Sequence, residues 1–236
     1  MENRLLACLS GPDLALLAPH LKQVPLLHGA VLHEPERTVE WVYFPMSGAV
    51  SLLVVMTAGE AVEIASVGRE GAIGLSAHSG PWRARTRAIV QVAGVAKALP
   101  ASVLATMIGQ REDMRDVMIR YQGTLAAQSQ RMAACNALHS VEERLARWLL
   151  QMSDRIEGAE IPVTQDTLAQ LLGVRRTTVT LVAHNLQVKG VIRYRRGHVA
   201  IASPRELRAL SCECYEACKQ ADELVQQGDL ALQTSA

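Results

Sequence analysis

The sequence lacks any long apolar run. Although 49% of its 236 residues are hydrophobic, no uninterrupted apolar stretch approaches the ~20 residues that a helix needs to cross a membrane. The N-terminus carries a single arginine, Arg4, and the polar segment from Ser10 to Asp13 interrupts its apolar residues. The basic start and continuous apolar core of a signal peptide are therefore missing. We expect a soluble, cytoplasmic protein with no membrane partner.

Cysteines in a disulfide framework are also missing. The five cysteines are an odd number without framework spacing, which is typical of reduced thiols in the cytosol; they are Cys8, Cys135, Cys212, Cys214 and Cys218.

Net charge is low as well, at +1, but it is unevenly spread. Residues 164–205 contain seven basic residues and one acid, so this segment carries +6 and the remainder −5. Such a concentrated basic segment predicts a polyanionic partner, because the local field attracts it. A merely solvated basic face is the alternative.

The sequence pattern of the N-terminal half is typical of a β-protein. A short helix is expected after Ser10, and from residue 24 to 100 short β-branched runs follow one another, separated by glycines. Residues 50–55, 62–67 and 89–92 are such runs. Many short strands at roughly ten-residue spacing predict an antiparallel sandwich or barrel.

A long helix is expected after Pro100, from about Arg111 to Ala137. Its apolar residues follow three- and four-residue steps and so form one narrow stripe. A helix of ~40 Å with such a stripe often packs against a copy of itself. We predict a dimer interface made by Met114, Val117, Met118, Tyr121, Leu125 and Met132. Burial of this stripe against the protein's own barrel is the alternative. A further amphipathic helix starts near Ser140, which has Glu143 in capping-box spacing.

Residues 164–186 form two helices that meet at a glycine. Thr164 is a suitable N-cap, and Gly173 accepts the left-handed conformation that ends a helix without a Cβ clash. Small and apolar residues repeat at helical steps around this joint, at Leu168, Ala169, Leu172, Val174, Val179, Val182 and Leu186. The pattern predicts a helix-turn-helix. A plain helical hairpin would not need arginines and hydroxyls where the second helix starts.

The start of that second helix carries side chains suited to DNA. In a helix-turn-helix it enters the major groove, where arginine binds guanine O6 and N7 and threonine commonly holds phosphates. A β-hairpin, or wing, is expected over residues 191–201, with arginines that would bind phosphates or, alternatively, keep an edge strand soluble. Glycine closes the second helix at Gly190, and Ser203-Pro204 opens a final helix. The predicted DNA-binding residues are Arg175, Arg176, Thr177, Thr178, Thr180, His184, Lys189, Arg193, Arg195 and Arg196.

With these elements in this order, the chain resembles the Crp/Fnr family of bacterial transcription regulators over nearly its whole length. The stretch from Gly173 to Val179 is similar to the start of the family's recognition helix. The resemblance implies a homodimer on double-stranded DNA with a two-fold-symmetric operator, acting through contact with RNA polymerase or its exclusion. Arg176 matches the family's arginine, whereas Thr177 stands where many members have glutamate and Leu181 replaces a later arginine. We therefore expect a different operator sequence.

The sensor half resembles the family less closely. Members that bind a cyclic nucleotide have a Gly-Glu pair for the ribose and an Arg-Ser or Arg-Thr pair for the phosphate. Here the corresponding residues are Gly74-Leu75 and Arg85-Thr86. The resemblance thus implies an effector site with Gly74, Arg85 and Thr86 but without the carboxylate, and we expect no dependence on cyclic AMP. Arg85 is alternatively a surface residue. Iron–sulfur relatives have an N-terminal cysteine cluster, where this chain has only Cys8.

Two other functions are weaker. A metal- or redox-responsive regulator would use Cys212, Cys214 and Cys218, although on a regular helix Cys212 lies about 200° from Cys214, so that three-thiol chelation is awkward. A cupin-like metal enzyme with His28, His33 and Glu34 would lack the tight His-x-His pair and leave the helix-turn-helix unexplained.

The fold class is therefore α+β. We expect an antiparallel, jelly-roll-like β-roll over residues 1–110, a dimerisation helix over 111–138, a winged helix-turn-helix over 139–210, and a C-terminal helix and tail over 211–236. No enzymatic activity, metal or cofactor is expected.

Overall fold

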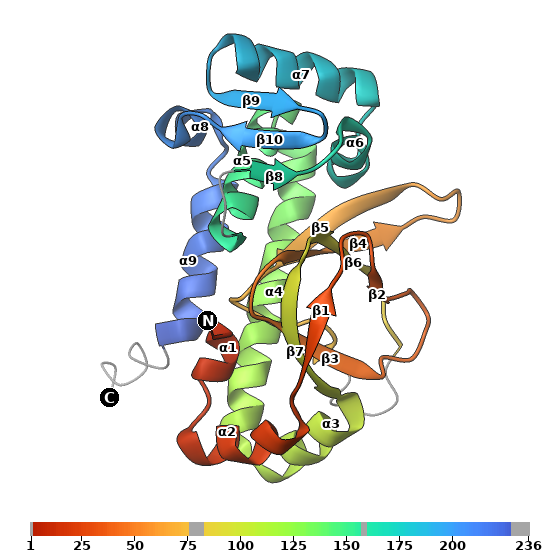
Figure 1. The fold of residues 1–236 in the computed structure, drawn as a ribbon, viewed down its shortest axis with the longest axis vertical. Helices are drawn as coiled ribbons and strands as arrows, with labels where there is room; N and C mark the ends of the chain where they lie inside the picture. Colours follow the sequence, from red (N-terminus) through yellow and green to blue (C-terminus); the bar gives the residue numbers. More distant parts are fainter. Residues whose placement is uncertain (1, 76–82, 157–159, 228–236) are drawn as a thin grey trace.

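The structure is a computed structural model. It describes residues 2–75, 83–156 and 160–227, and for residues 224–227 it describes the backbone alone. A β-roll occupies one part of the molecule, a long helix runs along it, and a small domain of helices and a sheet lies at the far end (Figure 1). The α+β class expected from the sequence is confirmed. Within the described ranges, no helix is long and apolar enough to cross a membrane.

The β-roll consists of two antiparallel sheets. One has the strand order β1-β7-β3, from Lys22–Leu26, Gly94–Pro100 and Trp41–Pro45. The other has the order β2-β6-β4-β5, from Val31–His33, Arg87–Val92, Ala49–Val55 and Ala61–Val67. All three β-branched runs predicted as strands lie in this second sheet. Ahead of the roll lie three short helices, α1 (Arg4–Ala7), α2 (Gly11–Leu17) and η1 (Ala18–His20), and Ser10 caps α2.

The core of the roll extends into the far domain. Side chains alternate along each strand, and residues such as Val50, Val67 and Val90 fill the inside of the roll. Leu53 of β4 and Ala61 of β5 instead belong to the same buried cluster as the helices of the far domain. The roll and the far domain are therefore in direct apolar contact through β4 and β5.

The long helix, α4 (Glu112–Leu138), follows the shorter α3 (Ala101–Gln110) and has the bounds expected from the sequence to within one residue. Its apolar stripe is not exposed, however. Met114, Val117, Met118 and Tyr121 are buried against the N-terminal helices and the roll, and Met132 is buried in a cluster of cysteines. Leu125 is half-buried against the roll. Five of these six side chains are therefore buried within their own chain and Leu125 is half-buried, which favours burial of the stripe against the protein's own barrel over the predicted dimer interface.

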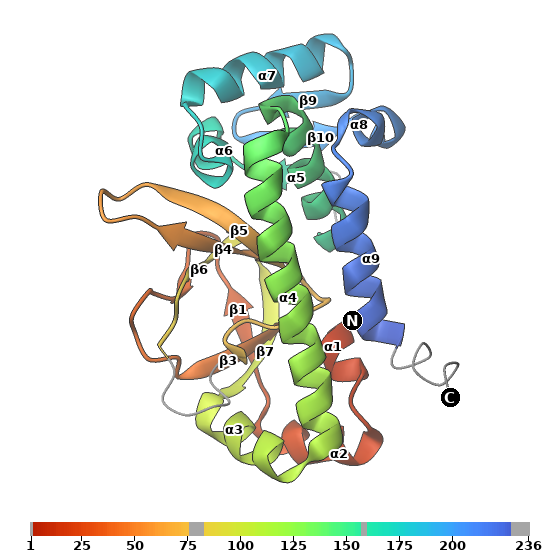
Figure 2. The same ribbon diagram turned by 180° about the vertical axis from the view of Figure 1, so that it is seen from behind.

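The opposite face of α4 is exposed along its whole length. Its residues recur at three- and four-residue steps and include Asp116, Ile119, Gly123, Ala127, Gln130, Ala134 and Leu138. In Figure 2 this helix lies in front of the roll, with no other element across it.

The inner face of α4 packs closely against the roll at Tyr121. The Tyr121 ring occupies the position where a Cβ of Gly71 would stand, and its hydroxyl donates to the Ala72 carbonyl over 3.2 Å.

The far domain begins with α5 (Val141–Arg155), which starts with the expected capping box of Ser140 and Glu143. It continues with β8 (Glu160–Pro162), α6 (Gln165–Leu172), α7 (Arg176–Val188), β9 (Ile192–Arg195) and β10 (His198–Ile201). The three strands form one antiparallel sheet in the order β8-β10-β9.

The chain then returns along the long helix. Ser203 caps α8 (Pro204–Leu210), and a break over residues 211–213 separates it from α9 (Cys214–Gln227). Helix α9 packs against α4 and α5 (Figure 2). The C-terminal segment thus fastens the far domain to the long helix.

Candidate DNA interface and effector cavity

The helix-turn-helix forms where the sequence predicts it. Thr164 accepts a hydrogen bond from the Thr167 backbone N–H, and Gly173 ends α6 with a φ of 62°. The joint is tight, because the Val174 N–H donates to the Ala169 carbonyl over 2.9 Å. Helix α7 begins at Arg176 with Arg175 as its N-cap residue. The predicted apolar residues face inward, with Leu168, Leu172, Val179, Val182 and Leu186 all buried.

The outer face of α7 carries the predicted DNA-reading side chains. Arg175, Arg176, Thr177, Thr180 and His184 are exposed, and Thr178 is half-buried. The helix lies at the end of the molecule, away from the roll (Figure 1). Leu181 lies on the same face and is 61% exposed. Its side chain is available to a partner that docks on this face, so it belongs to the candidate interface as well.

The wing is a tight hairpin. His198 pairs with Arg195, and the two turn residues have positive φ angles, 45° for Arg196 and 80° for Gly197. Such a two-residue turn matches the right-handed twist of its strands. The predicted arginines, Arg193, Arg195 and Arg196, are all exposed.

Hydrogen bonds hold the wing beside the helix-turn-helix. The Tyr194 hydroxyl donates to the Val163 carbonyl over 2.8 Å, just before the start of α6, and the pKa of Tyr194 is raised by burial. Gln187 of α7 accepts from the Tyr194 N–H over 3.0 Å. The wing and the recognition helix are therefore fixed relative to each other, as a surface that reads one stretch of duplex requires.

Three predicted residues have partners within the chain. Arg176 Nε lies 3.4 Å from the Asp166 carboxylate, and the Thr180 hydroxyl donates to Gln165 over 2.7 Å. Lys189 makes a close ion pair with Glu142 at the start of α5. Arg176 and Thr180 stay exposed on the outer face of α7, whereas the ion pair of Lys189 holds the end of α7 against α5.

A second feature is a cavity of about 390 Å³ between the roll and α4. The predicted effector residues Gly74, Arg85 and Thr86 all line it. Most of the other lining side chains are apolar: Val39, Leu52, Ile64, Ala72, Ile73, Leu75, Ala84, Leu125 and Ala126. No carboxylate is among the described residues that line this cavity.

Three polar side chains that line this cavity have partners within the chain. Arg85 is exposed and lies 3.4 Å from the Glu36 carboxylate. The pKa of His33 is lowered by burial, and its neutral ring donates from Nε2 to the Trp41 carbonyl over 3.0 Å. Gln122 donates to the Leu75 carbonyl over 3.1 Å. The cavity is thus suited to a largely apolar ligand, with one guanidinium at its edge.

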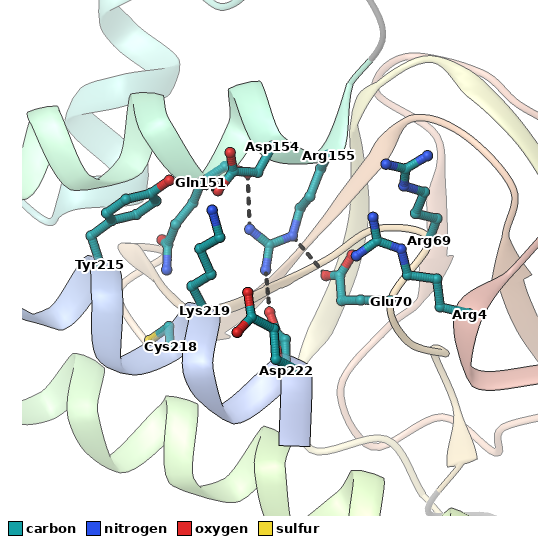
Figure 3. A pocket seen from close by; sticks show the side chains of 11 residues that line it. Arg4, Arg69, Glu70, Gln151, Asp154, Arg155, Tyr215, Cys218, Lys219 and Asp222 are labelled. Carbon is teal, nitrogen blue, oxygen red and sulfur yellow. Dashed lines mark hydrogen bonds and ion pairs between the residues drawn. The ribbon is translucent and has the colours of Figure 1, made fainter. Parts of the chain in front are cut away.

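A charged pocket of about 260 Å³ lies where the roll, α5 and α9 meet (Figure 3). At its centre, the buried Arg155 of α5 pairs with Glu70 of the roll and with Asp222 of α9. The pKa of Asp222 is raised to about 7, chiefly by burial. These ion pairs join three distant parts of the chain, and for that reason no local sequence pattern indicated them.

Only two of the three cysteines that the sequence offered as weak metal ligands lie in one group of possible ligands. Cys212 and Cys214 lie together with Cys135 and His139 of the long helix, whereas Cys218 lies in the same buried cluster but outside this group of four. The hydrogen bond between Cys212 and Cys135 lowers the pKa of Cys135. Sequence reasoning missed Cys135 and His139, although their spacing of four residues on a helix places both side chains on one face.

Comparisons with known proteins match both the helix-turn-helix domain and the overall fold. Residues 143–210 match a family model described as a Crp-like helix-turn-helix domain. Among solved structures, a transcriptional regulator assigned to the Crp/Fnr family from Eubacterium rectale is 17% identical, with a TM-score of 0.71 over 89% of this chain and 99% of that chain. No curated protein matches the sequence at a significant level.

Two further solved structures have the same architecture. FixK2 from Bradyrhizobium japonicum is 17% identical, with a TM-score of 0.70 over 81% of this chain and 98% of that chain. A Crp/Fnr family regulator from Thermus thermophilus is 23% identical, with a TM-score of 0.64 over 80% of this chain and 98% of that chain. At these identities the likeness establishes the fold.

Proposed function

We propose that the chain, which has a Crp-like helix-turn-helix domain and the fold of Crp/Fnr regulators, is a Crp/Fnr-type transcriptional regulator that binds a two-fold-symmetric operator as a homodimer. The observation that carries this proposal is the exposed, basic end of the molecule, where α7 and the wing are held together. A neutral protein that concentrates its positive charge on such an end is suited to DNA.

The two parts of this surface have different tasks. Arg176 at the start of α7 reads bases in the major groove, because a guanidinium can make two hydrogen bonds to guanine. Arg193, Arg195 and Arg196 on the wing bind phosphates and supply affinity that depends on salt. Leu181 contacts a thymine methyl group, the one apolar feature of the major groove. Thr177, Thr178, Thr180 and His184 complete the contacts to backbone or bases.

The dimer forms through the outer face of α4. This face is exposed over the length of a 27-residue helix, with Ile119 49% and Leu138 79% exposed. Gly123 lies between them, and a Cβ added there would meet nothing within 4 Å. Small residues allow two helices to approach closely, and pairing of this face removes both apolar side chains from water. Two recognition helices would then lie about one DNA turn apart, ~34 Å.

Regulation acts through the contact between the roll and the DNA-binding domain. The roll's effector, which is not cyclic AMP, would bind the cavity that Gly74, Arg85 and Thr86 line, and β4 and β5 connect that roll to the helix-turn-helix. The protein acts in the cytoplasm, has no enzymatic activity, and changes transcription by contacting or excluding RNA polymerase.

Selection of bound sequences from random DNA tests the proposal. We expect enrichment of an inverted repeat whose half-sites are separated by one helical turn. The matched control is Arg175→Ala/Arg176→Ala protein, whose selected pool should show no repeat. Recovery of a non-repeating site, or of no sequence at all from a folded protein, would contradict the homodimer on a symmetric operator.

A further inference from the structure

Four side chains that can bind a metal ion come together at one point beside the long helix. Cys135 and His139 belong to α4 and its C-terminal cap, whereas Cys212 lies in the link between α8 and α9 and Cys214 is the first residue of α9. The four ligand atoms all lie within 4.8 Å of one another. Residues 75 positions apart in the sequence have therefore been brought to one site by the packing of α9 on α4.

The distances match a tetrahedral metal site. The sulfur atoms of Cys135 and Cys212 are 3.6 Å apart, and Cys214 Sγ lies 3.7 Å from His139 Nδ1. With metal–sulfur bonds of about 2.3 Å and a metal–nitrogen bond of about 2.0 Å, a zinc tetrahedron has edges of about 3.8 Å between sulfurs and about 3.5 Å between sulfur and nitrogen. Two of the six ligand pairs are thus close to the spacing that a single ion requires, and the other four lie within 4.8 Å.

The histidine is oriented as a ligand. Its Nε2 atom lies 3.2 Å from a Glu213 carboxylate oxygen, a position that favours the tautomer with the proton on Nε2. In that tautomer the lone pair of Nδ1 faces the thiols, with Cys214 Sγ 3.7 Å away. A carboxylate behind a histidine is the usual arrangement around protein-bound zinc, because it fixes the ring and raises the basicity of the ligating nitrogen.

Packing alone does not account for this arrangement. Cys135, Cys212 and Cys214 are buried, and buried cysteines often act as small apolar side chains. An apolar role, however, does not require a histidine with a nitrogen directed at the sulfurs and a carboxylate behind it. A disulfide between Cys135 and Cys212 would use two of the groups and leave Cys214 and His139 without a task.

We propose that Cys135, His139, Cys212 and Cys214 bind one divalent ion of the zinc class in a closed tetrahedral site. Three thiolates and one imidazole are soft ligands, which prefer zinc to magnesium or calcium. Because all four positions are occupied by protein, the site is structural and not catalytic. Glu213 positions His139 and does not touch the ion.

The ion would hold the C-terminal segment at the junction between the long helix and the DNA-binding domain. His139 is followed directly by Ser140, which caps α5, so the site lies where the long helix meets the DNA-binding domain. The other two ligands lie in the link after α8 and at the start of α9. The bound ion therefore sets the angle between α4 and the DNA-binding domain; this consequence rests on the proposed function, whereas metal binding does not.

Metal content is the first test. Protein purified without chelator or affinity metal should contain about one zinc per chain, measured by mass spectrometry of the metals. Cobalt added to the metal-free protein should give the intense visible bands of tetrahedral thiolate coordination. Cys135→Ser and His139→Ala should lose both signals, and Cys218→Ser, a buried cysteine of the same cluster outside the four, should keep them.

Glu213→Ala gives a sharper test, because this side chain is exposed and its loss leaves the fold intact. Zinc affinity, measured by competition with a chromogenic chelator, should fall about 10–100-fold. Equal affinity in Glu213→Ala would remove Glu213 from the site. Failure of the wild-type protein to bind cobalt or zinc, or a Cys135–Cys212 disulfide in freshly purified protein, would overturn the proposal.

Operator binding separates the two proposals. If the ion sets the domain angle, metal-free protein should bind the operator more weakly than zinc-loaded protein, and zinc should restore the affinity. Equal affinity of both forms would refute the effect on the domain angle. One zinc per chain without DNA binding in either form would refute the proposed function and support the metal site.

Discussion

Arg155 at the end of α5 and Glu70 in the loop after β5 form an ion pair, with 2.7 Å between Nε and Oε1. Their side chains are only 5% and 10% exposed, and Glu70 Oε1 also accepts from the Gly68 N–H over 2.8 Å. A second carboxylate, that of Asp222, lies 3.5 Å from the same guanidinium. The roll, the DNA-binding domain and the C-terminal helix thus meet at one arginine (Figure 3).

Arg155→Ala should therefore be strongly destabilising. Removing one partner leaves a buried carboxylate without its counter-charge, which costs about 3–5 kcal/mol. Urea unfolding followed by circular dichroism measures this loss. The matched control is Arg87→Ala, which breaks a more exposed pair with Glu34 and should cost at most about 1 kcal/mol. Equal losses in the two variants would show that the Arg155 pair is no more than a surface contact.

Stability should depend on the ionisation of Asp222. Burial raises its pKa from 3.8 to about 7, against the attraction of Arg155 and Arg4 and with the repulsion of Glu70 and Glu223. The folded protein therefore holds this proton more tightly than the unfolded chain. The resulting stabilisation is complete below about pH 4 and is lost as the pH rises toward 7, with a slope of at most about 1.4 kcal/mol per pH unit.

Comparison with Asp222→Asn isolates this effect from other titrating groups. Unfolding free energies of the two proteins between pH 5 and 8, by urea titration, should diverge, with the wild type losing stability relative to the variant as the pH rises. Parallel curves would mean that Asp222 titrates at its ordinary pKa.

Arg176→Ala and Arg195→Ala should weaken DNA binding in different ways. Loss of a bidentate guanine contact removes ~1–3 kcal/mol of discrimination between operator and random DNA. Loss of a phosphate contact weakens binding to all DNA alike and lowers the salt slope by about one unit. Fluorescence anisotropy at several salt concentrations distinguishes these effects. Equal, sequence-independent losses from both substitutions would contradict the division between α7 and the wing.

Charge on the outer face of α4 should separate the dimer. Ile119→Glu with Gly123→Glu places carboxylates on the exposed stripe, where Ile119 is 49% exposed and a Cβ added at Gly123 meets nothing within 4 Å. Light scattering should show a monomer with weak operator binding. Leu16→Glu is the control, since Leu16 is 47% exposed on α2 and should leave the dimer intact. A dimeric, tight-binding double variant would place the interface elsewhere.

Cyclic AMP should bind poorly. Leu75, which the family resemblance places near the glutamate of nucleotide-binding members, is buried beside the cavity, and its side chain can accept no hydrogen bond. A ribose hydroxyl buried there without a partner costs roughly 1–3 kcal/mol. Calorimetry against cyclic AMP and cyclic GMP, with operator binding in the presence of each, measures the outcome. Micromolar binding that also strengthens DNA affinity would show this prediction to be wrong.

Much of the architecture could be predicted from the sequence, because it depends on interactions between residues close together in the chain. The caps at Ser140 and Thr164, the left-handed Gly173, and the spacing of apolar residues around it each depend on neighbours within a few positions. For this reason the bounds of the long helix and of the helix-turn-helix, and the exposure of Arg175 and Arg176, agree with the prediction. The β-branched runs likewise identified strands, though not which strands pair.

Long-range packing decided the rest. Periodicity showed that α4 has an apolar stripe, but a stripe can be buried by a copy or by its own chain, and only the position of the roll and of α9 determined that Met114 and Tyr121 lie inside. The same packing brought Cys135 and His139 to Cys212 and Cys214, and Arg155 to Glu70. The sequence alone determined which local structures form, because short-range sterics and hydrogen bonds select them; the tertiary structure decided which side chains from distant positions meet.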